Sequence, residues 1–230
     1  MERFDELVGR ALALATAPGD RRVLLGIAGS PGAGKTTLAE SLVAALAAAP
    51  PPGLDAGWVA HVPMDGYHLA DVELDRLGRR DRKGASDTFD AAGYAALLHR
   101  LREVPAPDAP PVYAPAFDRD IEQPVAGSIP VQPACRLVVT EGNYLLLDDP
   151  AWRAARAALD EVWFVEIDET VRNTRLVDRH VRFGKSPDFA RHWVATTDEP
   201  NARLVESTRT RADVLVRLSP SPDAVRVMEQ

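Results

Sequence analysis

Short apolar runs alternate along the chain with longer segments in which apolar residues recur at helical spacing. The apolar runs that we interpret as buried strands are residues 23–29, 58–64, 136–142, 161–167 and 213–218. Their near-continuous hydrophobicity, without strict alternation, is typical of parallel strands that are covered on both faces. The pattern therefore predicts an α/β fold with a mainly parallel five-stranded sheet and helices on both faces, arranged in three layers.

Three segments have the apolar spacing of helices. Residues 3–16 place apolar side chains three or four positions apart and are followed by Pro18-Gly19, so we expect residues 1–20 to form an N-terminal packing helix. The apolar positions on which this rests are Phe4, Leu7, Val8, Ala11 and Leu14. Residues 35–48 predict a second helix, ended by a run of prolines, and residues 90–103 predict a third.

Residues 65–135 are longer and less regular than the other connections. They include the proline-rich run "VPAPDAPPVYAP" at 104–115, for which we expect no regular structure. An insertion of this length is either a surface connection or the place where an enzyme builds a second binding site. With 230 residues the chain can bury one sizeable core, so we expect a single domain over residues 1–230 that carries this insertion.

Composition and charge exclude several classes of protein. Apolar residues make up 46% of the chain and charged residues 27%, as in ordinary globular proteins, and the net charge of -7 disfavours nonspecific nucleic-acid binding. Cys135 is the single cysteine, which excludes an internal disulfide, and its apolar surroundings predict a buried thiol. The acidic start, with Glu2, Asp5 and Glu6, is unlike a signal peptide, and no apolar run approaches the ~20 residues of a membrane span. We therefore expect a cytoplasmic protein with no membrane partner.

The stretch "GIAGSPGAGKTTLAE" at 26–40 fits the phosphate-loop pattern G-x-x-x-x-G-K-[ST], and it lies between a predicted strand and a predicted helix. Glycines let successive backbone N–H groups turn toward phosphate oxygens, and the following helix adds the positive end of its dipole. Lys35 is then expected to reach the β- and γ-phosphates, and the Thr36 hydroxyl to help hold Mg²⁺. The predicted nucleotide-binding residues are Gly29, Ser30, Gly32, Ala33, Gly34, Lys35, Thr36 and Thr37.

Two carboxylates follow predicted strands. In an open α/β sheet, ligands gather beyond the carboxyl ends of the strands, which would bring Glu141 and Asp65 to the phosphate loop. We interpret Glu141 as a metal-supporting group beside Thr36, and Asp65 as the carboxylate that orients an acceptor hydroxyl and accepts its proton. The structural alternatives are a solvated strand-end glutamate and an ordinary Asp-Gly turn. Tyr67 and His68 follow Asp65 and are candidates for lining an acceptor pocket.

An arginine stripe follows the fourth predicted strand. Intervals of three, four and three place its members on one face of a helix that Gly184 is suited to end. The stripe consists of Arg172, Arg175, Arg179 and Arg182. It is either a solvated face or, over residues 169–198, a lid that neutralises charge on a transferring phosphoryl group. We take Asp65, Lys35 and Arg179 as the candidate catalytic residues, although the sequence does not single out which arginine acts.

The order of these motifs resembles the phosphoribulokinase/uridine kinase/pantothenate kinase family of P-loop kinases, including its nucleoside/nucleotide kinase-like or fructose kinase-like branch. The resemblance extends over roughly residues 22–218 and includes "TRTRADVLV" near the end. It implies that Asp65 is the catalytic base and that the phosphate-loop Lys and Thr bind ATP and magnesium. The triplet Asp65-Gly66-Tyr67 departs from the Asp-Ser-Phe of uridine kinases and phosphoribulokinases and is closer to the Asp-Gly-Phe of pantothenate kinases.

Two segments of the insertion extend the resemblance. "RDRKGASDTFD" at 80–90 is similar to a pantothenate kinase segment with a basic Lys-Gly turn, and "PVYAPAFDRDIEQP" at 111–124 is similar to a Pro-x-Tyr-Asp…Arg segment of uridine kinases. By this resemblance Lys83, Tyr113 and Arg119 join Tyr67 and His68 as acceptor-binding residues. On its residues alone, 80–90 would be a polar loop.

The sequence therefore predicts an ATP- and Mg²⁺-dependent kinase that phosphorylates a hydroxyl of a nucleoside, a pantothenate-like compound or a sugar. Its expected partners are a nucleotide and a small-molecule acceptor, and a homodimer remains open. The alternative is a non-kinase P-loop GTPase or ATPase of regulatory or metallochaperone type. Such proteins usually carry an Asn-Lys-x-Asp motif or paired Cys or His ligands, and the chain has no such tetrapeptide and a single cysteine.

Overall fold

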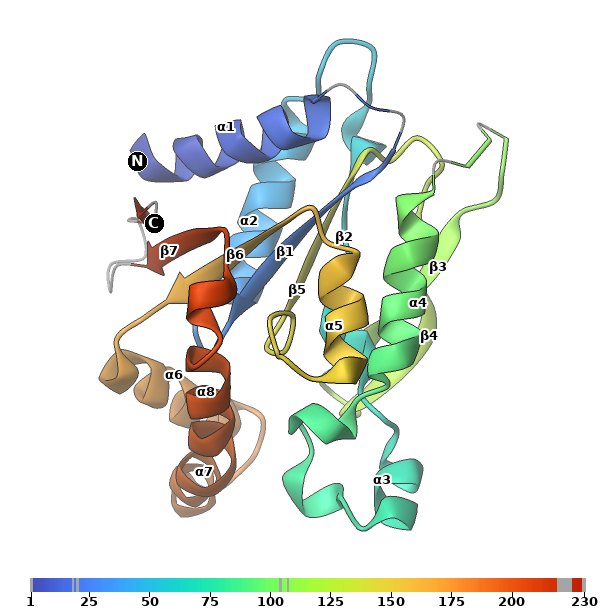
Figure 1. Ribbon diagram of the computed structural model, residues 1–230. Helices are drawn as coiled ribbons and strands as arrows, with labels where there is room; N and C mark the ends of the chain where they lie inside the picture. The colour runs from blue at the N-terminus through green and yellow to red at the C-terminus, as the bar shows by residue number, and fades with distance from the viewer. Residues whose placement is uncertain are drawn as a thin grey trace.

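The computed structural model describes residues 2–17, 19, 21–103, 105–106, 108–218 and 225–228. Its main sheet has the strand order β2-β5-β1-β6-β7-β8, with the first five strands parallel and β8 antiparallel to β7 (Figure 1). The strands are β1 Val23–Gly29, β2 Val59–His61, β5 Leu137–Gly142, β6 Glu161–Glu166, β7 Val214–Leu218 and β8 Val225–Met228. The predicted five-stranded parallel sheet is confirmed, and β8 extends it by one antiparallel strand.

Helices cover both faces of this sheet. Alternate residues of β1 point to opposite sides, so that Leu24 and Ala28 belong to one buried cluster and Leu25 and Ile27 to another. The first cluster includes side chains of α4 (Ala91–Arg102) and α5 (Pro150–Ala157), and the second includes those of α1 (Glu2–Thr16) and α2 (Lys35–Ala48). The three predicted helices are therefore present, and the three layers are those expected from the sequence.

Two details of the core bear on the sequence predictions. Cys135 is 2% exposed, and burial raises the pKa of its thiol to about 11, in line with the predicted buried thiol.

Strand β2 is shorter than the predicted 58–64, because it ends at His61. The Val62 N–H still bonds to the Val139 carbonyl oxygen, but Pro63 has no N–H to continue the ladder. Asp65 therefore lies in a separate short 3₁₀ helix, Met64–Tyr67, instead of at the strand end.

The insertion contains more regular structure than the sequence indicated. After helix α3 (Asp71–Leu77), strands β3 (Val112–Asp118) and β4 (Gln123–Val131) form a separate antiparallel hairpin. The expectation of no regular structure over 104–115 is thus wrong for its last residues. The hairpin accommodates Pro115 through an irregularity in register between Ala114 and Ala116, which is where a strand tolerates a missing N–H.

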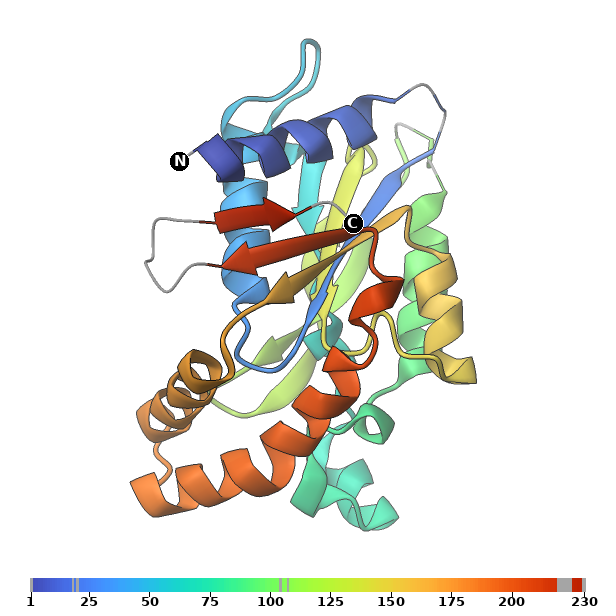
Figure 2. The same ribbon diagram turned by 60° about the vertical axis from the view of Figure 1, so that its left-hand side comes forward.

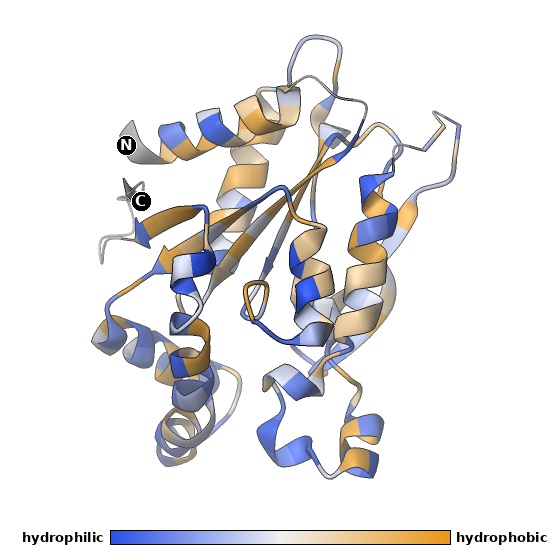
Figure 3. Cartoon of the chain, in the orientation of Figure 1, coloured by the Kyte–Doolittle hydropathy of each residue, from blue (hydrophilic) through white to orange (hydrophobic). Residues whose placement is uncertain are grey.

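Three helices follow β6 and project from the carboxyl edge of the sheet (Figure 2). They are α6 (Glu169–Arg182), α7 (Pro187–Trp193) and α8 (Glu199–Glu206), with a π-helical turn at Val194–Asp198 between the last two. Gly184 has a φ of 87° directly after α6, as its predicted role in ending this helix requires. Coloured by hydropathy, α6 is mainly hydrophilic, whereas the strands of the sheet are mainly hydrophobic (Figure 3).

Candidate active site

The phosphate loop connects β1 to α2, and its glycines are held by neighbouring elements. Gly34 has a left-handed conformation, with φ 96°, directly before α2. A Cβ at Gly32 would lie 2.8 Å from Leu176 Cγ of α6, and a Cβ at Gly29 would lie 2.8 Å from the Val165 carbonyl oxygen of β6. The glycines therefore serve close packing as well as backbone turning, and the loop lies directly against α6.

Lys35 is the first residue of α2 and is 7% exposed. Its Nζ donates to the Ser30 carbonyl oxygen at 3.0 Å and to Asn143 Oδ1 at 2.7 Å. Burial lowers the pKa of the Lys35 ammonium. Asn143 was not predicted from the sequence. It follows Glu141 by two residues at the end of β5, and its position beside a predicted strand-end carboxylate was the available signal.

Thr36 and Glu141 meet as predicted at this edge, because β5 is the immediate neighbour of β1. Thr36 Oγ1 donates to Glu141 Oε1 at 2.9 Å. Glu141 is 3% exposed, and burial together with the charge of Asp65 raises its pKa to about 7. A hydroxyl and a carboxylate are ligands that suit Mg²⁺, which takes its remaining ligands from phosphates and water. The described residues contain no cluster of three or more His, Cys, Asp or Glu that would form a metal cage without phosphate.

Asp65 is positioned by two close backbone contacts of its short helix. A Cβ at Gly66 would lie 2.3 Å from the Pro115 carbonyl oxygen of the hairpin, and a Cβ at Gly142 would lie 2.6 Å from Met64 Cβ. The first contact joins the Asp65 segment to β3, and the second joins it to the end of β5. Asp65 thus lies between the hairpin and the strand that carries Glu141.

The Asp65 carboxylate forms an ion pair with Arg119, with 3.3 Å between Arg119 Nη2 and Asp65 Oδ2. The charges of Asp65, Glu141, Arg119 and Arg179 all act on Lys35. These residues come from five different segments of the chain. The structure therefore brings together at one edge of the sheet the candidate base, the candidate metal-supporting carboxylate and three cations.

The remaining acceptor candidates lie in different environments. His68 packs between the rings of Phe89 and Phe117, at 4.0 and 4.6 Å between centroids, and its Nδ1 is 2.7 Å from the Asp65 carbonyl oxygen. Burial lowers the pKa of its imidazole. These contacts make His68 a residue that holds the Asp65 segment in place.

Tyr67 and Lys83 also make contacts within the insertion. Tyr67 packs against Tyr94, with 5.4 Å between ring centroids, and burial raises the pKa of its phenol to about 12. Lys83 Nζ donates to Asp71 Oδ1 at 2.6 Å and to the Glu122 carbonyl oxygen, so it joins α3 to the hairpin turn. Tyr113 is 55% exposed on β3, and no described contact brings it to Asp65.

The arginine stripe of α6 is divided by its surroundings. Arg172 is 4% exposed and pairs with Glu199 of α8 at 2.5 Å, whereas Arg175 and Arg182 are exposed. Arg179 is half-buried, and burial and the neighbouring charge of Arg119 lower the pKa of its guanidinium. Asp65 and Glu141 also act on Arg179. Of the four predicted lid arginines, Arg179 is thus the one that shares the electrostatic environment of the candidate base.

Helix α8 contacts the phosphate loop as well as α6. Ser30 is fully buried, and its hydroxyl donates to Glu206 at the carboxyl end of α8. Glu199 at the other end of the helix accepts from Arg172 of α6. Neither glutamate was predicted as part of the site, since both lie about 170 residues from the phosphate loop with no motif around them.

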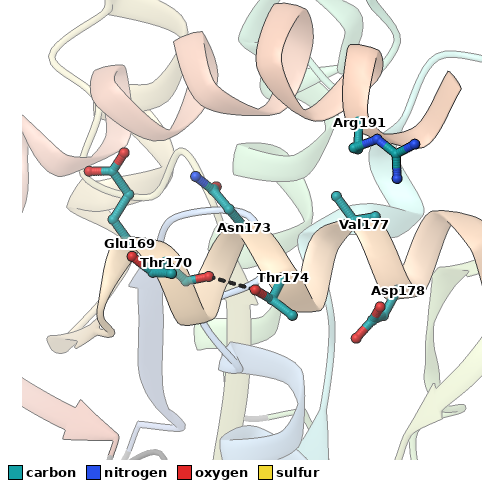
Figure 4. Close-up of a pocket in the computed structure, with 7 residues that line it drawn as sticks. All are labelled: Glu169, Thr170, Asn173, Thr174, Val177, Asp178 and Arg191. Atoms are coloured by element: carbon teal, nitrogen blue, oxygen red, sulfur yellow. Dashed lines mark hydrogen bonds between the residues drawn. The ribbon is translucent and has the colours of Figure 1, made fainter. Parts of the chain in front are cut away.

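Two surface hollows lie near these elements. One, of about 400 Å³, lies along α6 and is closed on one side by Arg191 of α7 (Figure 4). It is lined by Glu169, Thr170, Asn173, Thr174, Val177, Asp178 and Arg191. The other, of about 320 Å³, lies beyond the ends of β6 and β7 and includes Glu206, the partner of Ser30. Neither hollow is lined by a residue of the phosphate loop.

Comparison with known proteins agrees with this geometry. The chain is 39% identical over 159 residues to the ATP-dependent kinase-like protein notR' of Aspergillus versicolor, covering 66% of this chain and 92% of the relative. It is 33% identical over 220 residues to a protein of Schizosaccharomyces pombe that is provisionally named a uridine kinase, covering 93% and 90%. No family model matches the chain.

Solved structures show the same fold. A protein of Silicibacter sp. TM1040, provisionally named a fructose transport system kinase, superposes with a TM-score of 0.81 at 36% identity and covers 94% of this chain and 98% of its own. YFH7 of Saccharomyces cerevisiae shares the fold, with a TM-score of 0.75 at 20% identity over 95% and 99% of the two chains. The chain belongs to the phosphoribulokinase/uridine kinase family of P-loop, ATP-dependent kinases, which confirms the predicted resemblance. None of its described helices combines the length and apolar character needed to cross a membrane.

Proposed function

We propose that the protein transfers the γ-phosphate of ATP to a hydroxyl group of a small molecule, with Asp65 as the base. The acceptor classes under test are nucleosides, pantothenate-like compounds and sugars. The observation that carries the proposal is that the Asp65 segment packs, through Met64, against Gly142 at the end of β5, next to Glu141, whose carboxylate accepts from Thr36 of the phosphate loop. A base and a phosphate-binding lysine at one edge are what an in-line transfer needs.

The donor half of the site is the phosphate loop. Backbone N–H groups of residues 29–36 and the start of α2 bind the phosphates, and Lys35 neutralises charge on the β- and γ-phosphates. Thr36 and Glu141 are the residues that would hold Mg²⁺. When bound, this ion would neutralise charge on the β- and γ-phosphate oxygens.

The acceptor half is the insertion over residues 65–135. The Asp65 carboxylate accepts a hydrogen bond from the acceptor hydroxyl and takes its proton as the oxygen bonds to the γ-phosphorus. His68 and Gly66 keep the Asp65 segment against the hairpin, so the carboxylate is held in a fixed place for this step. Arg119 and Tyr67 are the remaining candidates for contact with the acceptor.

The lid is proposed to cover residues 169–198, with Arg179 as the arginine that acts on the transferring group. Arg172 is paired with Glu199, and Arg175 and Arg182 are exposed, so neither of these environments supplies a free cation inside the site. Arg179 is half-buried and acts electrostatically with Asp65 and Lys35, and its partial burial strengthens its effect on developing negative charge.

The test is a coupled ADP-release assay of the purified protein with Mg²⁺·ATP and each acceptor class in turn. Asp65→Asn is expected to lower acceptor-dependent turnover by roughly 10²- to 10⁴-fold. Asp81→Asn, which changes an exposed acid of the same insertion, is expected to leave it unchanged. If no acceptor raises ADP release above the basal rate and Asp65→Asn has no effect, the assignment as a small-molecule kinase with Asp65 as base is wrong.

A further inference from the structure

The ion pair between Arg119 and Asp65 is unusual for a base that must accept a proton. Arg119 Nη2 lies 3.3 Å from Asp65 Oδ2 and so occupies one of the two oxygens available for a hydrogen bond from a hydroxyl. We infer that Arg119 is a positioning residue that holds the Asp65 carboxylate while no acceptor is bound, and that it thereby limits ATP hydrolysis by water. This inference rests on the proposed function of Asp65.

The two partners differ in how firmly they are held. The Asp65 segment is fixed on several sides, since the Asp65 carbonyl oxygen accepts from the His68 N–H at 3.1 Å and Gly66 packs against the Pro115 carbonyl oxygen. Arg119 instead lies in the hairpin turn, and its side chain is 44% exposed compared with 26% for Asp65. A change in this contact therefore involves movement of the arginine, with Asp65 staying in place.

The resting position of Arg119 is itself supported. Its guanidinium carbon lies 5.9 Å from the centre of the Phe117 ring, over which Lys83 also lies at 5.4 Å. The Phe117 ring in turn packs against His68, which is bonded to the Asp65 carbonyl oxygen. Arg119 is thus stacked on the same group of side chains that holds the candidate base.

This arrangement matters because water competes with the acceptor. A free carboxylate next to the γ-phosphate can orient water, which attacks the γ-phosphorus as the bond to ADP breaks, so that ATP and water give ADP, phosphate and a proton. With Arg119 on Oδ2, one acceptor position of the carboxylate is taken and fewer remain to orient water. A half-exposed ion pair is weak, so an acceptor that contacts both side chains can replace it on binding.

Acceptor-independent ADP release from Mg²⁺·ATP tests the inference. Arg119→Gln is expected to raise this basal rate by about two- to fivefold, which corresponds to the loss of one exposed ion pair. Arg119→Lys keeps a cation at the turn and is expected to stay near the wild-type rate. Arg153 lies on α5, far along the chain from Asp65, and forms an exposed ion pair with Asp148. Arg153→Gln removes this pair and serves as the matched control.

The double variant Asp65→Asn/Arg119→Gln separates this effect from a structural one. If Arg119 acts through Asp65, the double variant has the basal rate of Asp65→Asn, while thermal unfolding shows that each variant is folded. An unchanged basal rate in Arg119→Gln, or an equal increase in the Asp65→Asn background, overturns the inference. If Asp65→Asn changes neither the basal nor the acceptor-dependent rate, the proposed function itself fails.

Discussion

Gly66 allows the hairpin to pack closely against the Asp65 segment, because glycine has no side chain. The Pro115 carbonyl oxygen lies 2.3 Å from where a Cβ would stand, a distance that real Cβ atoms do not show. Pro115 backbone atoms surround this position, so they cannot yield as a flexible side chain would. The Asp-Gly pair, which the sequence also allowed as an ordinary turn, is here the point at which the hairpin approaches the candidate base.

Gly66→Ala is therefore expected to displace the hairpin from the Asp65 segment. We expect the free energy of unfolding to fall by about 1–3 kcal/mol, as in other overpacked sites, and acceptor-dependent turnover to fall as well. Urea unfolding and the ADP-release assay measure the two effects. Gly9→Ala on α1 is the control, because nothing lies within 4 Å of its Cβ position and a helical alanine is expected to be neutral or stabilising.

His61 predicts a pH dependence of stability. Its Nε2 is buried without a hydrogen-bond partner, and burial lowers the pKa of the imidazole to about 4. The unfolded chain, with a pKa near 6.5, binds a proton first as the pH falls. The stabilising contribution is therefore present above about pH 6.5 and is lost as the pH falls toward 4.

We expect wild-type protein to lose on the order of 2 kcal/mol more stability than His61→Phe between pH 7 and pH 4.5. The measurement is urea unfolding of both proteins at each pH. Because the two proteins share all other titratable groups, the difference between their free energies of unfolding reports on His61 alone. Equal losses in the two proteins would contradict the assigned cause.

At this scale the sequence predicted the residues that belong to motifs and missed those that only the fold brings together. Lys35 and Thr36 were predicted from the phosphate-loop motif, and Glu141 and Asp65 because strand ends of a parallel sheet share one edge. Asn143 and Glu206 contact the phosphate loop through side-chain geometry that no spacing in the chain encodes.

Among the elements, α6 is the clearest case in which the sequence predicted the spacing of side chains but not which of them are buried. Spacing placed four arginines on one side of a helix, but burial of that side depends on α8, which comes later in the chain, after α7 and a π-helical turn. Arg172 is consequently enclosed with Glu199, whereas Arg175 remains exposed. The hairpin was missed for a related reason, since prolines argued against strands that tolerate them at a local irregularity.

The buried pair between α6 and α8 predicts a large effect on stability. Arg172→Met leaves Glu199, which is 15% exposed, without its buried partner, and we expect a loss of about 3 kcal/mol in the free energy of unfolding. Arg203→Gln removes a cation from the same glutamate, but Arg203 is 79% exposed and its loss is expected to be below about 1 kcal/mol. Chemical denaturation of both variants measures the contrast, and similar losses would argue against burial as the cause.

For the whole molecule, the buried sheet is distinct from the segments that are proposed to meet the substrates. Strands β1, β5 and β6 are fully or almost fully buried, with hydrogen bonds to neighbours on both sides, whereas α6 to α8 and residues 65–90 contribute only Val205 and Phe89 to the buried clusters. The sequence located the strands of the sheet, because their continuous apolar runs differ in composition from the more polar segments between them.

Hydrogen exchange is expected to follow the same division. Amides of β1, β5 and β6 should exchange at the rate of global unfolding, and those of α6 to α8 should exchange faster through local opening. Saturating Mg²⁺·ATP should slow exchange in α6 to α8, and in Lys35→Met this slowing should be absent. If, in the absence of nucleotide, the amides of α6 to α8 exchange as slowly as those of β1, these helices do not open independently of global unfolding.

The two ends of α8 hold different parts of the site, with Ser30 of the phosphate loop bonded to Glu206 and Arg172 of α6 bonded to Glu199. A helix of this length is a stiff rod of about 12 Å. We expect a displacement of Ser30 at one end of α8 to shift the other end, where Glu199 holds Arg172 of α6. Phosphate binding in the loop and the position of α6 are therefore expected to be coupled through α8.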